Sequence, residues 1–202
     1  LLGTLVEHAD AGHLTSGQVV ELARDILVAG FETTARQLVN SVYVLSVTPG
    51  SWGWLQHDRT RVPTAVEELL RFIPLGAGGF RLRVTNAPLL LGKGTSNPVT
   101  IGPKEVIIAP TSAANTDPGH FADPRTLRLD RQANNHLTFG HGAHRCLGAQ
   151  FARMELDAGL HQLLEDVPTI ALAISEQDLQ WSHGLQVRGP RTLPIRSLDR
   201  NT

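Results

Sequence analysis

The spacing of apolar residues predicts a largely helical chain. Apolar side chains recur at helical intervals over residues 16–47, which predicts one long helix. Thr15 and Gln18 stand at its start with the spacing of a capping box. A second amphipathic helix is predicted over residues 63–72, with a proline in its first turn.

The pattern changes after the second helix to short apolar runs separated by glycine, proline and asparagine, which is typical of small antiparallel strands. These runs are residues 89–91, 99–101 and 106–108, with two more in the tail, 170–174 and 186–188. Residues 111–138 are predicted to be mostly irregular, and an irregular stretch of this length in a compact domain is usually functional.

A last helix is predicted from Leu147, and it is apolar on nearly every face, as expected of a core helix. The expected fold is mainly α with a small β portion. No repeat or low-complexity linker divides the chain, so we expect a single domain over residues 1–202.

Composition excludes several classes of protein. Hydrophobic residues make up 41% of the chain and charged residues 18%, and no apolar run approaches the roughly 18 residues of a membrane span. With 18 basic and 19 acidic residues, there is no overall positive field to attract nucleic acid or anionic lipid. The single cysteine, Cys146, excludes an internal disulfide, and no signal-peptide layout is present, so we expect a soluble cytoplasmic protein.

The strongest local feature is the segment over residues 139–148, which leads into the last helix. A thiol at the start of a helix faces unpaired backbone N–H groups and the positive end of the helix dipole, which stabilise the thiolate. Gly140 and Gly142 permit backbone angles closed to other residues, and Gly148 lets a flat ligand approach the helix. Cys146 is therefore a candidate metal ligand.

Residue types alone leave other interpretations of Cys146 open. A lone cysteine is most often a small buried hydrophobe. Cys146 could bind zinc together with His141 and His144, with a fourth ligand from elsewhere. A cysteine nucleophile would instead need a histidine base close in space.

Residues 139–148 resemble the cysteine-ligand loop of cytochrome P450 monooxygenases, F-G-x-G-x-H-x-C-x-G, and match every fixed position. The resemblance implies that Cys146 is the axial thiolate ligand of haem b and that Phe139 packs near the sulfur. It also implies that His144 hydrogen-bonds a haem propionate and that Gly140 and Gly148 line the cofactor site. The alternative for His144 is an exposed loop histidine.

In the middle of the long helix, Gly30 and two adjacent threonines weaken one turn. Taken alone, this turn indicates close helix packing at Gly30 and threonines that bond back to the preceding turn. It also resembles the oxygen-activation motif of the same family, A-G-x-(D/E)-T. By that resemblance Ala29 and Gly30 open a groove over the iron, Thr33 holds bound dioxygen, and Glu32 relays protons from solvent.

Glu68 and Arg71 place opposite charges at i, i+3 on the second helix, where such pairs are usually solvated. They resemble the E-x-x-R pair of the family, and Arg131 stands where the family has a third member. The resemblance implies a buried, structural Glu-Arg-Arg network that holds the haem loop. By a looser match Arg83 is a propionate partner, with Arg81 as its rival.

The three motifs occur in the order of the family and look most like its bacterial class. The resemblance implies the C-terminal, haem-binding half of a longer monooxygenase that hydroxylates or epoxidises a small organic substrate with O2. Electrons would come from NAD(P)H through a ferredoxin or flavodoxin-type donor and its reductase. Arg145 and Arg153 would meet acidic residues of that donor, unless they form ordinary surface or internal pairs.

Two alternatives come from other classes of protein. The chain starts inside an apolar stretch without an initiator methionine, so a truncated, inactive product that binds haem weakly or not at all is the second hypothesis. A zinc or thiol enzyme is the third.

Overall fold

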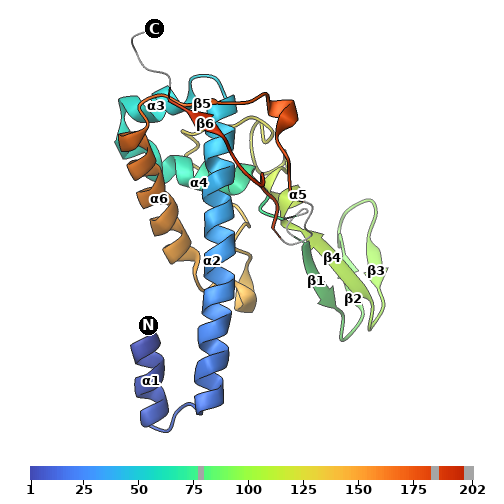
Figure 1. Ribbon diagram of the computed structural model, residues 1–202. Coiled ribbons are helices and arrows are strands. Elements are labelled where there is room, and N and C mark those ends of the chain that lie inside the picture. Colours follow the sequence, from blue (N-terminus) through green and yellow to red (C-terminus); the bar gives the residue numbers. More distant parts are fainter. Residues whose placement is uncertain (77–79, 183–186, 198–202) are drawn as a thin grey trace.

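The computed structural model describes residues 1–76, 80–182 and 187–197, and Figure 1 shows a helical body from which a long helix and a small β lobe project. The α-helices are α1 (Leu2–Asp10), α2 (Ser16–Val47), α3 (Ser51–His57), α4 (Val62–Phe72), α5 (Thr111–Asn115) and α6 (Ala149–Asp166). Short 3-10 helices are η1 (Arg59–Arg61), η2 (Gly142–His144) and η3 (Glu176–Asp178). The strands are β1 (Phe80–Val84), β2 (Leu89–Leu91), β3 (Val99–Ile101), β4 (Val106–Pro110), β5 (Ala171–Leu172) and β6 (Ile195–Arg196).

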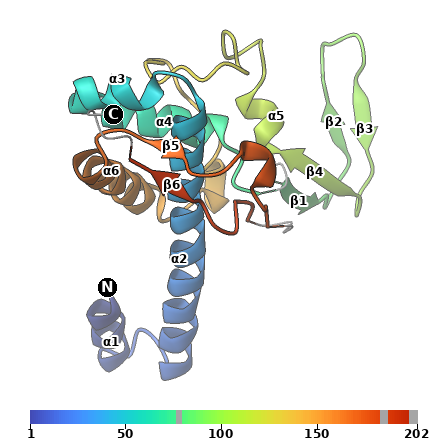
Figure 2. The ribbon, with the colours of Figure 1, turned by 45° about the horizontal axis from the view of Figure 1, so that its top comes forward.

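The long helix α2 begins and ends where the apolar spacing predicts. Its capping box is formed, since the backbone N–H of Gln18 donates to Thr15 Oγ1 at 3.2 Å and the N–H of Thr15 donates to Gln18 Oε1 at 2.8 Å. Buried residues of α2 occur only from Gln37 onward. The first half of the helix and α1 stand away from the helical body (Figure 2).

The core lies where the second half of α2 packs with α3, α4 and α6. Leu55, Val62 and Leu160 are fully buried there, and each such side chain contributes about 1.5–3 kcal/mol through burial. α6 approaches α2 closely at Gly159, because a Cβ at this position would lie 2.9 Å from a methyl group of Leu38. The glycine therefore sets the closest approach of these two helices.

α6 is a core helix on one face only. Leu156, Leu160 and Leu164 are buried, as expected, but the side chains of Phe151 and Met154 are 67% and 65% exposed. The prediction of a helix buried on nearly every face is wrong, because α2, α3 and α4 all pack on one side of α6. The exposed apolar face lies at the end of α6 that follows the cysteine loop.

The strands form three two-stranded antiparallel sheets, β1 with β4, β2 with β3, and β5 with β6. The prediction of small antiparallel strands before residue 110 is confirmed. In the tail, β5 lies within the predicted run over 170–174 and pairs with β6, which was not predicted. The strand predicted over 186–188 is wrong for residues 187–188, which form none. Residue 186 lies outside the described residues. α1 and α3 were not predicted. Both are short, although α1 has apolar residues at helical spacing, Leu2, Leu5, Val6 and Ala9.

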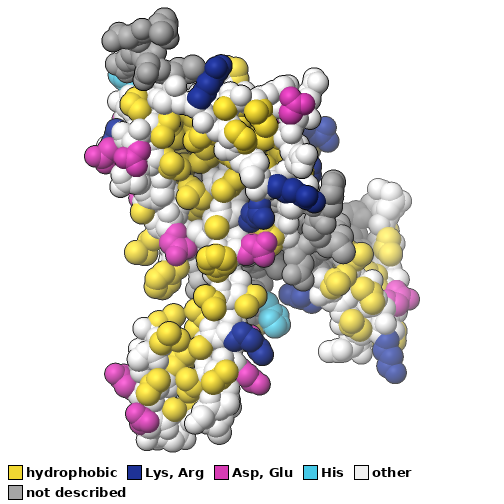
Figure 3. All heavy atoms as spheres, viewed as in Figure 1, with side chains coloured by type: hydrophobic (Ala, Val, Ile, Leu, Met, Phe, Trp, Pro, Cys, Tyr) yellow, Lys and Arg dark blue, Asp and Glu magenta, His cyan; other side chains and the backbone are white. Residues whose placement is uncertain are grey.

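In the part of the chain that the structure describes, no helix is both long enough and apolar enough to cross a membrane. Apolar side chains nevertheless gather on the surface of α1 and the first half of α2 (Figure 3). Among them, Val6, Val20 and Leu27 are more than half exposed.

Candidate functional site

The loop before α6 presents Cys146 to solvent. Gly140 and Gly142 both adopt a φ of 73°, in the left-handed region that the glycine spacing predicts. The backbone N–H of Cys146 donates to the carbonyl of buried Phe139 at 2.8 Å, which closes the loop on itself. The thiol is exposed, so the interpretation of Cys146 as a buried hydrophobe is wrong.

α6 begins at Ala149, two residues later than predicted, with Gly148 as its N-cap. Cys146 therefore lies just before the helix, still at its N-terminal end. A Cβ on Gly148 would meet no atom within 4 Å, so the surface beside the thiol is open. This open surface can accommodate a flat ligand.

An open cavity of about 190 Å³ lies between the β1–β4 sheet and the cysteine loop. The chain places Arg83 and His144, far apart in sequence, on the wall of the same cavity together with Gly140. The other residues of its lining are Ala109, Pro110, Thr111, Ala114, Leu137 and His141. A guanidinium and an imidazole on one wall suit a carboxylate ligand. The side chain of the rival, Arg81, lies outside the described residues.

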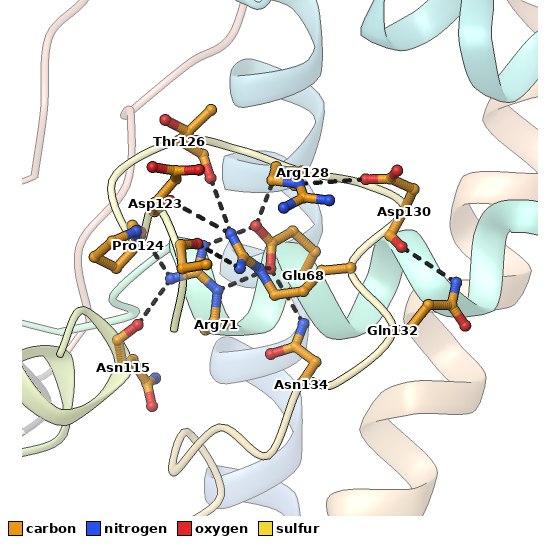
Figure 4. A network of polar contacts seen from close by, with 12 residues as sticks. Glu68, Arg71, Asn115, Asp123, Pro124, Thr126, Arg128, Asp130, Gln132 and Asn134 are labelled. Atoms are coloured by element: carbon orange, nitrogen blue, oxygen red, sulfur yellow. Dashed lines mark hydrogen bonds and ion pairs between the residues drawn. The ribbon is translucent and has the colours of Figure 1, made fainter. Parts of the chain in front are cut away.

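Glu68 is the centre of a buried ionic network (Figure 4). Its carboxylate accepts hydrogen bonds from Arg71 Nε at 2.8 Å, Arg71 Nη2 at 2.7 Å and Arg131 Nε at 2.9 Å. The backbone N–H of Arg128 donates to it at 2.9 Å, and Asn134 Nδ2 at 3.2 Å. The three predicted members are thus in contact, although Arg131 lies far from the other two in the sequence.

The same guanidinium groups hold the irregular segment onto α4. Arg71 Nη1 donates to the carbonyls of Asn115 and Pro124 at 2.7 and 2.8 Å, and Arg131 Nη1 donates to that of Ala122 at 2.8 Å. Burial alone would raise the pKa of Glu68, but the hydrogen bonds from Arg71, the Arg128 amide and Arg131 outweigh it and lower the pKa. Glu68 is therefore charged in the folded chain, as the network requires.

The turn of α2 that carries the threonine motif is continuous helix. Thr33 Oγ1 donates to the carbonyl of Ala29 at 2.6 Å, the expected bond back to the preceding turn. A Cβ on Gly30 would meet no atom within 4 Å, so close helix packing at Gly30 is wrong. Ala29, Gly30 and Glu32 are exposed, and Phe31 is 76% exposed. The turn thus has an open surface next to it.

The packing of α6 on α2 brings this turn to the level of the cysteine loop. The two helices run in the same direction (Figure 1) and touch where Gly159 meets Leu38. At 1.5 Å per residue, Gly30 lies about 12 Å before that contact along α2, and Ala149 about 15 Å before it along α6. The open turn and the loop of Cys146 therefore lie at similar heights on neighbouring helices.

Arg153 does not lie free on the surface. Its Nε and Nη2 donate to the two carboxylate oxygens of Glu67 at 2.6 and 2.9 Å, and the guanidinium lies 4.6 Å from the ring centroid of Phe139. The expectation that Arg153 meets a partner protein is wrong, and the alternative of an internal pair holds. Arg145 is exposed.

Sequence reasoning missed several members of these networks. Asn134 completes the set of donors around Glu68. Asn115, in α5, binds the residues just before the cysteine loop, since Leu137 N–H donates to its Oδ1 at 2.7 Å. Glu67 and His136 were also missed. The sequence carries no signal for them, because these contacts join residues far apart in the chain.

The zinc alternative has no assembled ligand set. Within the described ranges, no three histidine, cysteine, aspartate or glutamate side chains are grouped as metal ligands, and this includes Cys146, His141 and His144.

Comparison with known families and proteins agrees with the motifs. Residues 1–167 match the cytochrome P450 family. The chain is 41% identical over 195 residues to nocardicin C N-oxygenase of Nocardia uniformis subsp. tsuyamanensis. This alignment covers 96% of the chain and 48% of that relative. It is also 41% identical over 196 residues to mycinamicin IV hydroxylase/epoxidase of Micromonospora griseorubida, with the same coverage.

Comparison with solved structures also finds similarity to cytochrome P450 proteins. The structure of SgvP, a putative thioether synthase in the tailoring step of griseoviridin, matches with a TM-score of 0.88 and 39% identity over 96% of this chain and 49% of that one. The mixed-function P450 MycG matches with a TM-score of 0.85 and 41% identity over 91% of this chain and 45% of its own. The chain spans about half the length of the relatives it matches.

Proposed function

Because the chain belongs to the cytochrome P450 family, we propose that it supplies the haem-binding part of a monooxygenase acting on a small organic substrate. The observation that carries the proposal is the placement of Cys146. Its exposed thiol lies at the N-terminal end of α6, next to the loop residues that line a cavity together with Arg83 and His144. A soft sulfur ligand next to partners for carboxylates matches the donor set that haem b needs.

The residues around the loop fit this group. Arg83 and His144 would hold its propionates, while Gly140 and Gly148 leave the loop open to a flat macrocycle. The exposed apolar side chains of α6 support the fit, since a large apolar ligand would cover surface that otherwise contacts water. Haem b with a thiolate ligand supplies activation of O2, because the thiolate favours O–O bond cleavage.

Thr33 and Glu32 would manage protons for the reaction. The hydroxyl of Thr33, which donates to the Ala29 carbonyl at 2.6 Å, would be the group that delivers a proton at the open turn of α2. The exposed carboxylate of Glu32 would renew that proton from solvent. One oxygen atom enters the substrate and the other leaves as water, after two electrons and two protons are taken up.

The electrons would come from NAD(P)H through a ferredoxin or flavodoxin-type protein and its reductase. Arg145, exposed directly before Cys146, is the cation that would meet an acidic surface of that donor. Arg153 is excluded from this role by its pairing with Glu67. The reactions named for the relatives, N-oxygenation, hydroxylation and epoxidation, define the class of chemistry proposed for this chain.

The test is the absorption spectrum of the purified chain after it is supplied with haem, reduced and exposed to carbon monoxide. A strongly red-shifted Soret band in the wild type, absent in Cys146→Ser, is expected if Cys146 is the thiolate ligand. An unshifted band, or no bound haem, would overturn the proposal for this chain. That result would favour the alternative of an inactive product that does not retain haem.

A further inference from the structure

A second polar cluster lies on the side of α4 next to the Glu68 network. Its members are Glu67 of α4, Arg153 of α6 and His136 of the irregular segment. Arg153 and Glu67 form a two-point ion pair at 2.6 and 2.9 Å, and their side chains are only 25% and 30% exposed. A two-point guanidinium–carboxylate pair fixes the orientation of both groups.

His136 completes the cluster. Its side chain is 1% exposed, and its Nε2 lies 3.2 Å from Glu67 Oε2. The backbone N–H of Thr138 donates to His136 Nδ1 at 3.3 Å, so Nδ1 is an acceptor and Nε2 carries the hydrogen that goes to Glu67. The carboxylate of Glu67 therefore joins two segments, α6 and residues 136–138, to α4.

Two members of the cluster, Arg153 and His136, contact the ring of Phe139. The guanidinium of Arg153 lies 4.6 Å from the ring centroid, within the range of a cation–π contact, and the ring of His136 lies 5.9 Å away on a tilted plane. Phe139 is buried, and its carbonyl accepts the backbone N–H of Cys146. The position of the cysteine backbone thus depends on a residue that the cluster holds.

Glu67 and Glu68 bind different parts of the irregular segment. Glu68 binds Arg131 and the amide of Arg128, earlier in the segment, and the cluster of Glu67 binds its end, where the cysteine loop begins. Because adjacent residues on a helix point about 100° apart, α4 can hold the segment at two separate places.

We propose that Glu67, His136 and Arg153 form a clamp on Phe139 that holds Cys146 in the conformation that ligates haem, an inference that rests on the proposed function. Arg153 and Glu67 act here as positioning residues. Loss of the clamp loosens the cysteine loop while the Glu68 network keeps the rest of the segment in place.

The first test needs no haem. Amide hydrogen exchange is measured in the full chain for wild type, Arg153→Met, Arg153→Lys and the control Asp166→Asn, which alters an exposed contact with Gln162 on the same helix. In Arg153→Met we expect the amide of Cys146 to exchange about tenfold faster or more, because a charge-assisted pair and a ring contact are lost. Arg153→Lys keeps the charge and should retain part of the protection.

The amides of Arg128 and Arg131, which belong to the Glu68 network, are expected to keep their protection in all four proteins. Unchanged exchange at Cys146 in Arg153→Met would overturn the clamp. An equal rise at Arg128 and Arg131 would also overturn it, since it would show general loosening of the fold.

The second test uses haem-loaded protein and the reduced carbon monoxide complex. At equal haem content, Arg153→Met should show a smaller fraction of the red-shifted band than wild type, Arg153→Lys an intermediate fraction and Asp166→Asn an unchanged one. Partners of this kind typically change metal-site affinity by about 10–100-fold. Equal fractions in all four would overturn the clamp and leave the proposed function standing. If wild type lacks the band, the proposed function fails, and the exchange experiment alone decides on the clamp.

Discussion

Replacing Glu68 by glutamine should destabilise the folded chain by about 3–5 kcal/mol, the usual cost of leaving one member of a buried ion pair without its partner. The side chains of Glu68 and Arg71 are fully buried and that of Arg131 is 6% exposed, so water cannot replace the lost charge. Glutamine keeps one acceptor oxygen but turns an N–H₂ group toward the guanidinium donors.

The free energies of the individual hydrogen bonds to Glu68 cannot simply be added, and their sum is only an upper limit on the destabilisation. Each bond to a charged acceptor is worth about 1.5–3 kcal/mol, and adding those of four donor residues would exceed what one side chain contributes in a domain of about 5–15 kcal/mol total stability. A graded variant is available in Asn134→Ala, which removes one donor at 3.2 Å and should cost about 1.5 kcal/mol.

The assay is urea unfolding followed by the fluorescence of the three tryptophans, with the free energy of unfolding taken from the midpoint and slope. Arg128→Gln is the matched control, because its backbone N–H still reaches Glu68 while its side chain is 44% exposed and pairs only weakly with Asp130. The control should change stability by less than about 1 kcal/mol.

Equal losses of stability in Glu68→Gln and Arg128→Gln would show that the buried charge of Glu68 does not stabilise the fold. The same network leads us to expect that Glu68→Ala abolishes haem incorporation, since the segment before the cysteine loop would no longer be fixed. Normal haem occupancy in Glu68→Ala would overturn that assignment.

Further predictions concern other parts of the chain. Thr33→Ala should divert electrons from product into peroxide with little loss of stability, and an unchanged ratio of product formed to NAD(P)H consumed would exclude the role of Thr33. Burial raises the pKa of Glu67, but His136 and Arg153 outweigh it and lower the pKa from 4.5 to about 2. A lowered pKa stabilises the fold above pH 4.5, and this contribution is lost as the pH falls toward 2, so Glu67→Gln should flatten the stability profile in that window. Leu160→Ala should cost about 2–5 kcal/mol in urea unfolding, because a fully buried side chain leaves a cavity, whereas Leu27→Ala, at an exposed site, should cost far less.

The features that could be predicted from the sequence are those that depend only on residues close to one another in the chain. The capping box at Thr15, the bounds of α2 and the left-handed glycines before Cys146 each depend on backbone preferences within a few positions. The pair of Glu68 and Arg71 is equally local, since i, i+3 residues on a helix lie side by side.

Only the tertiary structure decided which partners meet across the chain. Spacing alone could not show that Arg153 turns inward to Glu67, 86 residues away, or that His136 joins them. It also could not show that one apolar face of α6 is exposed, because hydrophobic periodicity reveals that a face is apolar and not what covers it. Local chemistry fixed the motifs, and the packing of α4 and α6 determined what those motifs hold in place.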